Sequence, residues 1–203
     1  MHGRQALLDL FGCRDQRSLP IALEELLVSL KAIKLDRTDL AGTLIFDDRA
    51  YRRITIRRRP HYQALVLCWL TGQSSPIHDH VGSSCAVRVV EGRASETRYK
   101  STPCGRLVPT RSHMVPAGSV TGCRGDGIHQ LANLEQRGCE LITLHVYSPP
   151  PSGWRYYPIE LTTLADNDRL IRERPATQIV DLGHEVPGAP LGRKARGKIP
   201  WKA

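Results

Sequence analysis

Two histidines separated by one residue give the segment from Gly72 to Gly92 the strongest chemical signal in the chain. Side chains at positions i and i+2 of a β-strand point to the same face. His78 and His80 can therefore reach one metal ion, while Asp79 points away. The β-branched, apolar runs on either side of this segment are bounded by Gly and Pro, which is typical of strands. The pattern predicts a metal site on a β-strand.

Two imidazoles do not make a stable site, so a third ligand is required. His129 is the best candidate, because it lies in the strand-like stretch Gly-Ile-His-Gln-Leu-Ala-Asn. Three neutral imidazoles suit zinc, copper, iron or nickel, and affinity does not decide among them. A zinc hydrolase with three histidines and a water is the direct rival. The remaining histidines are expected at the surface: His2, His61, His113 and His184.

The spacing of the first segment resembles the first cupin motif. That motif has a glycine, five residues, a histidine, one residue, a histidine, four residues, a metal-binding glutamate, six residues and a glycine. Gly72, His78, His80 and Gly92 fit, but Cys85 stands at the glutamate position. The site has therefore lost its only carboxylate ligand and gained a thiol.

The second histidine segment agrees with this resemblance, since His129 and Asn133 reproduce the end of the second cupin motif. We expect a first shell of histidine nitrogens alone, without Asp79, Glu91 or Glu96. A divalent ion held by neutral imidazoles keeps its full positive charge. An anionic ligand such as a thiolate should then be drawn to the open positions.

Three segments, Ser75–Cys85, Ile128–Asn133 and Leu144–Pro150, together resemble the cysteine dioxygenases, the iron-dependent thiol dioxygenases of the cupin superfamily. The resemblance runs from about Tyr51 to Pro150. It implies Fe(II) bound by the three histidines and L-cysteine chelated through its thiolate and amine. O₂ is the second substrate, and both oxygen atoms go to sulfur, giving cysteine sulfinic acid. Chelation replaces a chance encounter with a positioned reaction.

The Tyr51-Arg-Arg53 segment matches the family's Tyr-x-Arg, which implies that Arg53 binds the substrate carboxylate. A planar guanidinium makes two parallel charge-assisted hydrogen bonds with a carboxylate. Its neighbour Arg52 should face the other way, while Tyr51 and Trp69 are expected to wall the pocket. Without the resemblance, Arg53 is one of five arginines in eight residues, and a solvated strand face would explain it.

Thr143, His145 and Tyr147 alternate along one strand and share a face, so they can form a hydrogen-bonded row that orients the phenol. A polar ladder without chemistry is the plainer interpretation. The resemblance further implies a thioether between Cys85 and Tyr147. The alternative is that the two are pocket residues without a covalent link. It also implies a cis peptide bond at Ser148-Pro149.

Two alternatives stay open. A dioxygenase for 3-mercaptopropionate or another small thiol generally carries Gln where Arg53 stands and lacks the Ser-x-Cys after the second histidine. Arg53 and Cys85 therefore favour cysteine. A non-enzymatic cupin that stores or senses a ligand belongs to another class, and the histidine trio together with the Thr-His-Tyr row argues against it.

The composition limits the class of protein. The formal charge of +9 lies largely in the Arg52–Arg59 stretch and in Arg193–Lys198. Because no basic stripe with aromatic residues accompanies it, we expect no nucleic-acid partner. No apolar run approaches a membrane span, so no membrane partner is expected either. Six scattered cysteines and no signal sequence predict free thiols in a cytoplasmic protein. The oligomeric state stays open.

The hydrophobic pattern predicts an all-β fold, a cupin-type small β-barrel or jelly roll with N-terminal helices packed outside. Residues 20–33 show the helical repeat, and a shorter helix is expected at 4–11. We divide the chain into a helical segment 1–42, a catalytic barrel 43–165 and a polar, basic tail 166–203. The expected strands are Leu44–Phe46, Tyr51–Arg58, Tyr62–Leu70, Ala86–Val90, Ser95–Tyr99, Ser119–Cys123, Gln130–Asn133 and Glu140–Tyr147.

Overall fold

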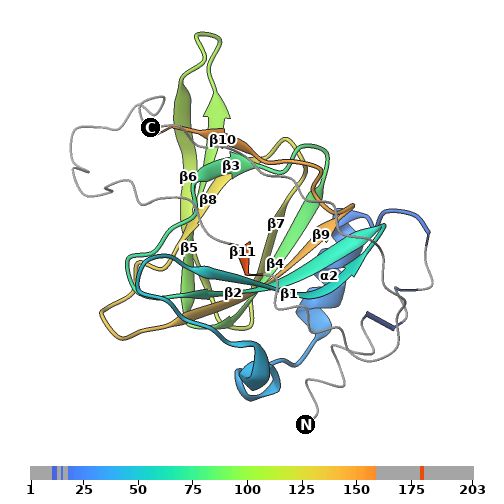
Figure 1. The fold of residues 1–203 in the computed structure, drawn as a ribbon. Helices are drawn as coiled ribbons and strands as arrows, with labels where there is room; N and C mark the ends of the chain where they lie inside the picture. The colour runs from blue at the N-terminus through green and yellow to red at the C-terminus, as the bar shows by residue number, and fades with distance from the viewer. Residues whose placement is uncertain (1–10, 13–14, 16–17, 159–178, 181–203) are drawn as a thin grey trace.

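The computed structural model describes residues 11–12, 15, 18–158 and 179–180, which form two facing β-sheets (Figure 1). The six-stranded sheet has the order β11-β1-β2-β9-β4-β7, and the five-stranded sheet has the order β10-β3-β8-β5-β6. All neighbours are antiparallel except β1 and β11. The strands are β1 (Arg52–Arg59), β2 (Tyr62–Trp69), β3 (Ile77–Asp79), β4 (Ser84–Glu91), β5 (Arg93–Ser101), β6 (Leu107–Pro116), β7 (Val120–Cys123), β8 (Ile128–Ala132), β9 (Leu141–Ser148), β10 (Arg155–Tyr157) and β11 (Ile179–Val180).

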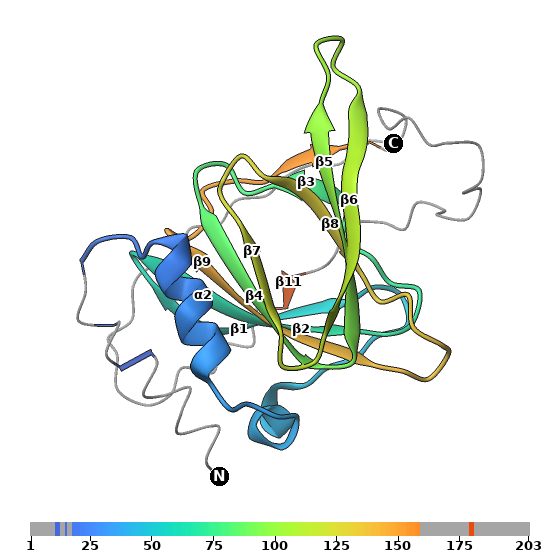
Figure 2. The ribbon, with the colours of Figure 1, turned by 180° about the vertical axis from the view of Figure 1, so that it is seen from behind.

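The helix α2 (Leu23–Ala32) lies across the outer face of the six-stranded sheet (Figure 2). Its buried face carries Leu23, Leu26 and Leu30, at the helical spacing that the sequence predicts. These side chains join one apolar core with the outward-facing residues of β2, β4 and β9. A second core fills the space between the two sheets. The predicted all-β, cupin-type barrel with a helix packed outside is confirmed.

Arg88 on the barrel forms a hydrogen bond with the backbone of the helix. It lies on β4 with an exposed fraction of 7%. Its Nη1 donates hydrogen bonds to the carbonyl of Leu30 on α2 at 3.0 Å and to that of Gly118 at 3.1 Å. Burial lowers the pKa of this guanidinium. The last turn of the helix and the loop before β7 are therefore held by one buried cation.

The observed strands differ from the predicted ones at Leu44–Phe46, at β6 and at the short strands β10 and β11, which were not predicted. Leu44–Phe46 is not a strand but a connection after the 3₁₀ helix η1 (Thr38–Thr43). Strand β6 was not predicted, because its residues are mostly exposed and show no apolar alternation. It pairs with β5 in a long hairpin that projects beyond the barrel. The predicted helix at 4–11 lies almost wholly outside the described residues.

Three antiparallel pairings place the predicted site residues. His78 on β3 lies directly opposite His129 on β8. Cys85 on β4 lies opposite Tyr147 on β9 on one side and opposite Cys123 on β7 on the other.

None of the helices in the described part of the chain is long and apolar enough to cross a membrane. The three-part division of the chain stays a prediction.

Candidate metal centre and substrate pocket

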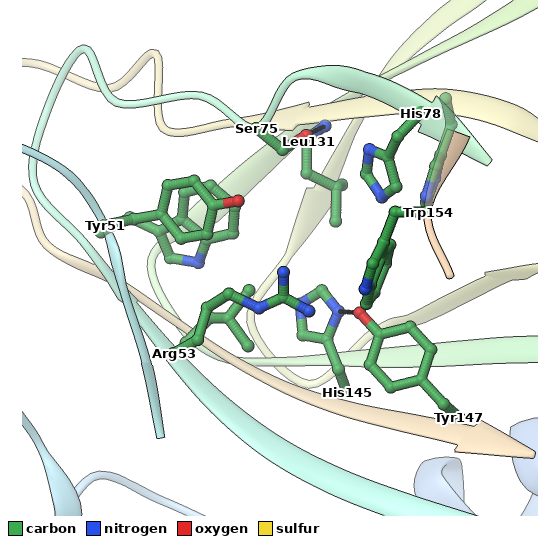
Figure 3. Close-up of a pocket in the computed structure, with 11 residues that line it drawn as sticks. Tyr51, Arg53, Ser75, His78, Leu131, His145, Tyr147 and Trp154 are labelled. Atoms are coloured by element: carbon green, nitrogen blue, oxygen red, sulfur yellow. Dashed lines mark hydrogen bonds between the residues drawn. The ribbon is translucent and has the colours of Figure 1, made fainter. Parts of the chain in front are cut away.

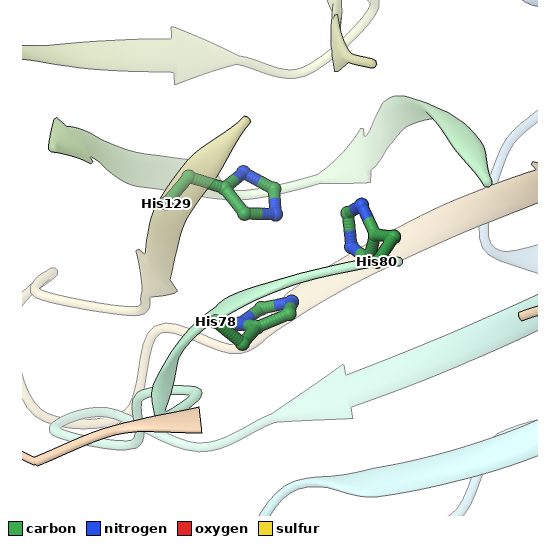
Figure 4. Close-up of side chains that lie close together, drawn as sticks. All are labelled: His78, His80 and His129. Carbon is green, nitrogen blue, oxygen red and sulfur yellow. The ribbon is translucent and has the colours of Figure 1, made fainter. Parts of the chain in front are cut away.

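The three predicted metal ligands come together inside the barrel. His78, His80 and His129 are buried, with exposed fractions of 8%, 0% and 2%. One nitrogen from each lies within 4.8 Å of the others, and Figure 4 shows the rings converging. His78 and His129 are cross-strand partners, while His80 directly follows β3. The chain therefore brings together the histidine trio that its motifs predict.

The Nδ1 atom of each ring is held by a different group. His78 Nδ1 lies 2.8 Å from the Pro76 carbonyl, His129 Nδ1 lies 3.1 Å from Glu96 Oε1, and His80 Nδ1 lies 3.4 Å from Cys123 Sγ. Such contacts to the second nitrogen fix the orientation of metal-binding imidazoles. His80 Nε2 is buried without a hydrogen-bond partner, and His129 Nε2 has only the long contact of 3.9 Å to Cys123 Sγ. The site therefore fits a metal.

The protonation of the trio is uneven. Burial, reinforced by the neighbouring His129, lowers the pKa of His78 to about 3 and lowers that of His80 further. Burial also disfavours the charged form of His129, but Cys123 and the Glu96 carboxylate outweigh it and raise the pKa to about 10. Hydrogen bonds from His129 and Thr121 overcome burial to lower the pKa of Glu96 to about 2. Glu96 is therefore a carboxylate that supports His129 through Nδ1.

No carboxylate of the described residues belongs to the histidine group. Asp79 points away and accepts hydrogen bonds from the Tyr157 hydroxyl at 2.7 Å and the Val81 amide at 3.1 Å. Glu91 pairs with Arg37 at the surface. The cluster therefore offers an ion three neutral donors once His129 has lost its proton.

A row of hydrogen bonds leads from the barrel interior to the pocket. Trp69 Nε1 donates to Thr143 Oγ1 at 3.0 Å, so the Thr143 hydroxyl is left to donate to His145 Nε2 at 2.9 Å. Burial lowers the pKa of His145, which keeps the ring neutral. Its single proton then lies on Nδ1, which donates to the Tyr147 oxygen at 3.2 Å. The phenol proton of Tyr147 is therefore directed away from His145, and the side chain also forms a hydrogen bond with the Cys85 thiol.

The Tyr147 hydroxyl stays protonated, because burial raises its pKa. Its side chain also interacts with the thiol of Cys85, whose pKa burial raises as well. The two residues are therefore neighbours, as the resemblance implies. The predicted cis bond between Ser148 and Pro149 is confirmed.

The pocket beside the histidines has a volume of about 20 Å³. Its floor contains Tyr51, stacked on Trp69 at a ring separation of 4.0 Å. Arg53 points into the pocket (Figure 3) with an exposed fraction of 7%. Its guanidinium has no hydrogen-bond partner among the described residues and lies 4.4 Å from the centre of the Trp154 ring. Arg52 faces the other way and pairs with Asp47.

The sequence model of the family Cysteine dioxygenase type I matches residues 14–158. The chain belongs to the cysteine dioxygenase family. The human cysteine dioxygenase type 1 is 25% identical over 134 residues, which cover 64% of this chain and 66% of the human protein. The zebrafish (Danio rerio) protein of that name is 27% identical over 146 residues, covering 68% and 70%. A solved Klebsiella pneumoniae protein with a double-stranded β-helix domain is 14% identical, with a TM-score of 0.49 and coverage of 58% and 87%.

Three residues of this cysteine dioxygenase family member were not predicted at the site: Glu96, Cys123 and Trp154. Glu96 lies in a predicted strand, but a charged strand residue is ordinarily exposed. Cys123 was one of several scattered cysteines. Trp154 follows the Ser-Pro-Pro turn in a loop without periodicity. Only the pairing of β10 with β3 brings it to the histidines.

Two histidines that we expected at the surface are placed differently. His61 is buried, with an exposed fraction of 4%. Its ring packs edge-on against Tyr62, and its carbonyl accepts a hydrogen bond from the Ser148 hydroxyl. His113 on β6 is half-buried and lies 3.3 Å from Glu96 Oε2. Pairing between β5 and β6 brings it there. His2 and His184 lie outside the described residues.

Proposed function

We propose that this protein is an Fe(II)-dependent thiol dioxygenase that oxidises L-cysteine with O₂ to cysteine sulfinic acid. One observation supports this above the others: three buried histidines, with no carboxylate of the described residues in their group, lie close to the buried guanidinium of Arg53, whose Nε has no hydrogen-bond partner among those residues. The residues present fit an iron ion, to be held by His78, His80 and His129. The iron would supply the binding of the thiolate and amine and the activation of O₂.

The charges of the pocket are opposite in sign to those of cysteine. Neutral imidazoles leave a divalent ion its two positive charges, and Arg53 adds a third. Cysteine with its thiolate and carboxylate brings two negative charges, and its uncharged amine is a further donor. Arg53 would hold the carboxylate through two parallel N–H···O bonds. Because the guanidinium is buried against Trp154, water competes little for this pair.

Tyr147 would act as a hydrogen-bond donor to the substrate side of the pocket. With His145 Nδ1 donating to its oxygen, the phenol proton is directed away from His145. The row from Trp69 through Thr143 fixes this direction, since each oxygen or nitrogen acceptor in it is already used. We also propose that Cys85, the neighbour of Tyr147, becomes joined to the phenol ring during turnover through a C–S bond that replaces the S–H bond and one ring C–H bond, with O₂ accepting the two electrons and two protons.

O₂ uptake by the iron-loaded protein tests the proposal. L-cysteine should give one O₂ consumed per sulfinate formed, with the product identified by NMR. A faster reaction with 3-mercaptopropionate than with L-cysteine would make 3-mercaptopropionate the substrate, and the protein would still be a thiol dioxygenase. Binding of thiols without O₂ uptake would instead establish a ligand-storing or ligand-sensing protein. We also propose a cytoplasmic location, supported by the five described cysteines, which are free thiols.

A further inference from the structure

Trp154 differs from the other residues around the pocket in its exposure. Ten of the eleven lining residues are buried, and Trp154 alone among these described residues is half-buried. Its partial exposure places Trp154 where the pocket meets solvent. Figure 3 shows its ring among the side chains that line the cavity. A ligand that reaches the histidines has to fit beside this ring.

The indole spans the distance between the carboxylate anchor and the metal ligands. Its ring centre lies 5.5 Å from that of His78, 5.2 Å from that of His80 and 5.3 Å from that of Tyr147. On its other side the guanidinium carbon of Arg53 lies 4.4 Å from the ring centre. A cysteine held at both ends would place its Cα and Cβ atoms along this wall.

The contact with Arg53 leaves the carboxylate site open. The guanidinium carbon of Arg53 lies over the indole ring, and an indole N–H is a donor without an acceptor, so the ring takes no hydrogen bond from the Arg53 N–H groups. Trp154 therefore desolvates and orients Arg53 without using the donors that a carboxylate needs. The stacked cation is itself attracted to the indole face.

The backbone fixes the position of Trp154. It directly precedes β10, whose three residues pair with β3, the strand that carries His78. Tyr157 on β10 donates a hydrogen bond to the buried Asp79 carboxylate at 2.7 Å, and Arg155 lies 3.6 Å from the same group. Two strands and a buried carboxylate therefore anchor the loop, which makes the indole a fixed wall.

We infer that Trp154 is a specificity-determining residue that limits the substrate to thiols with an unbranched carbon next to sulfur. This inference depends on the proposed thiol dioxygenase function. L-penicillamine tests it, because this compound keeps the thiol, amine and carboxylate of L-cysteine and adds two methyl groups at Cβ. In a tight pocket, each added methyl or methylene group costs about 10- to 200-fold in kcat/KM.

The experiment compares kcat/KM for L-cysteine and L-penicillamine in the iron-loaded wild type, Trp154→Ala and Trp154→Phe. We expect the ratio of penicillamine to cysteine to rise at least about tenfold in Trp154→Ala and less than about threefold in Trp154→Phe. The value for cysteine itself should fall in Trp154→Ala, because Arg53 loses its supporting ring. An unchanged ratio in Trp154→Ala would overturn the inference.

A binding measurement separates this inference from the proposed function. The cobalt(II)-loaded protein reports thiolate binding by absorption without any turnover. Trp154→Ala should bind L-penicillamine at least about tenfold more tightly relative to L-cysteine than the wild type does. If the wild type binds both thiols equally well, the wall does not select by size, and the inference fails. Absence of O₂ uptake with intact, selective binding would refute only the dioxygenase. Circular dichroism and metal content check that each variant is folded and loaded.

Discussion

Glu96→Gln isolates the contribution of a carboxylate that supports the metal site without belonging to it. Glu96 has an exposed fraction of 0%. It accepts hydrogen bonds from His129 Nδ1 at 3.1 Å and from Thr121 Oγ1 at 2.6 Å. Arg98 and His113 approach its other oxygen at 3.5 and 3.3 Å. The substitution keeps the shape, removes the charge and replaces one acceptor oxygen with an NH₂ group.

The expected loss follows from the contact that changes. An amide oxygen carries no net charge, so it accepts a weaker hydrogen bond from His129 Nδ1 than the carboxylate does. The imidazole is then a weaker and less firmly oriented metal ligand. Loss of such a partner weakens metal binding by about 10- to 100-fold, or about 1.4–2.7 kcal/mol. Competition with a chromophoric chelator for Zn(II) measures this without oxidation of the ion.

Glu135→Gln is the matched control, because Glu135 pairs with Arg93 at 2.9 Å on the surface. An exposed pair of this kind contributes about 0–1 kcal/mol to stability, and it lies away from the metal site. We expect its metal affinity to stay within about twofold of the wild type, well below the effect at Glu96. A Glu96→Gln variant that is folded by circular dichroism and binds Zn(II) within threefold of wild type would refute the supporting role.

Three further predictions concern the ligands, the carboxylate anchor and the thioether. Replacing any one of the three histidines with Ala should abolish both iron retention and turnover, measured by metal analysis and O₂ uptake; a variant that keeps stoichiometric iron contradicts the ligand set. Arg53→Gln should lower kcat/KM for cysteine by tens to several hundredfold, about 2–4 kcal/mol, and affect cysteamine far less; Arg52→Gln is the control, and an equal loss with both thiols would make Arg53 structural. Mass spectrometry after turnover should find a peptide pair of Cys85 and Tyr147 lighter by two hydrogens, absent in Cys85→Ser; a pair that stays unlinked excludes the crosslink.

The sequence predicts those parts of the site that short-range rules determine. Strand alternation places His78 and His80 on one side, and it places Thr143, His145 and Tyr147 in one row. Side-chain direction along a strand follows from the backbone alone, so these residues needed no knowledge of the remaining chain. The third ligand, His129, came from its strand-like stretch and the likeness to the second cupin motif, and the pairing of β8 with β3 brings it to His78.

The parts that the sequence does not predict depend on pairings between distant segments. Trp154 reaches the histidines only because β10 pairs with β3. Glu96 is buried because β5 lies between β6 and β8, which bring His113 and His129 to it. Strand β6 itself has polar residues on both faces and relies on β5 for its hydrogen bonds. Hydrophobic periodicity contains no information on such contacts.

The buried Arg88 has a consequence for where the chain can be cut. A shortened protein starting at the first strand would lose the Leu30 carbonyl that accepts from this guanidinium and the leucines that cover the outer face of the sheet. The Arg88 guanidinium would keep only the Gly118 carbonyl as its acceptor, and a bare apolar surface would remain. The helix is thus a required part of the folded barrel, packed on its outer face. Transplanting the thiol pocket into another protein would require carrying the helix along with it.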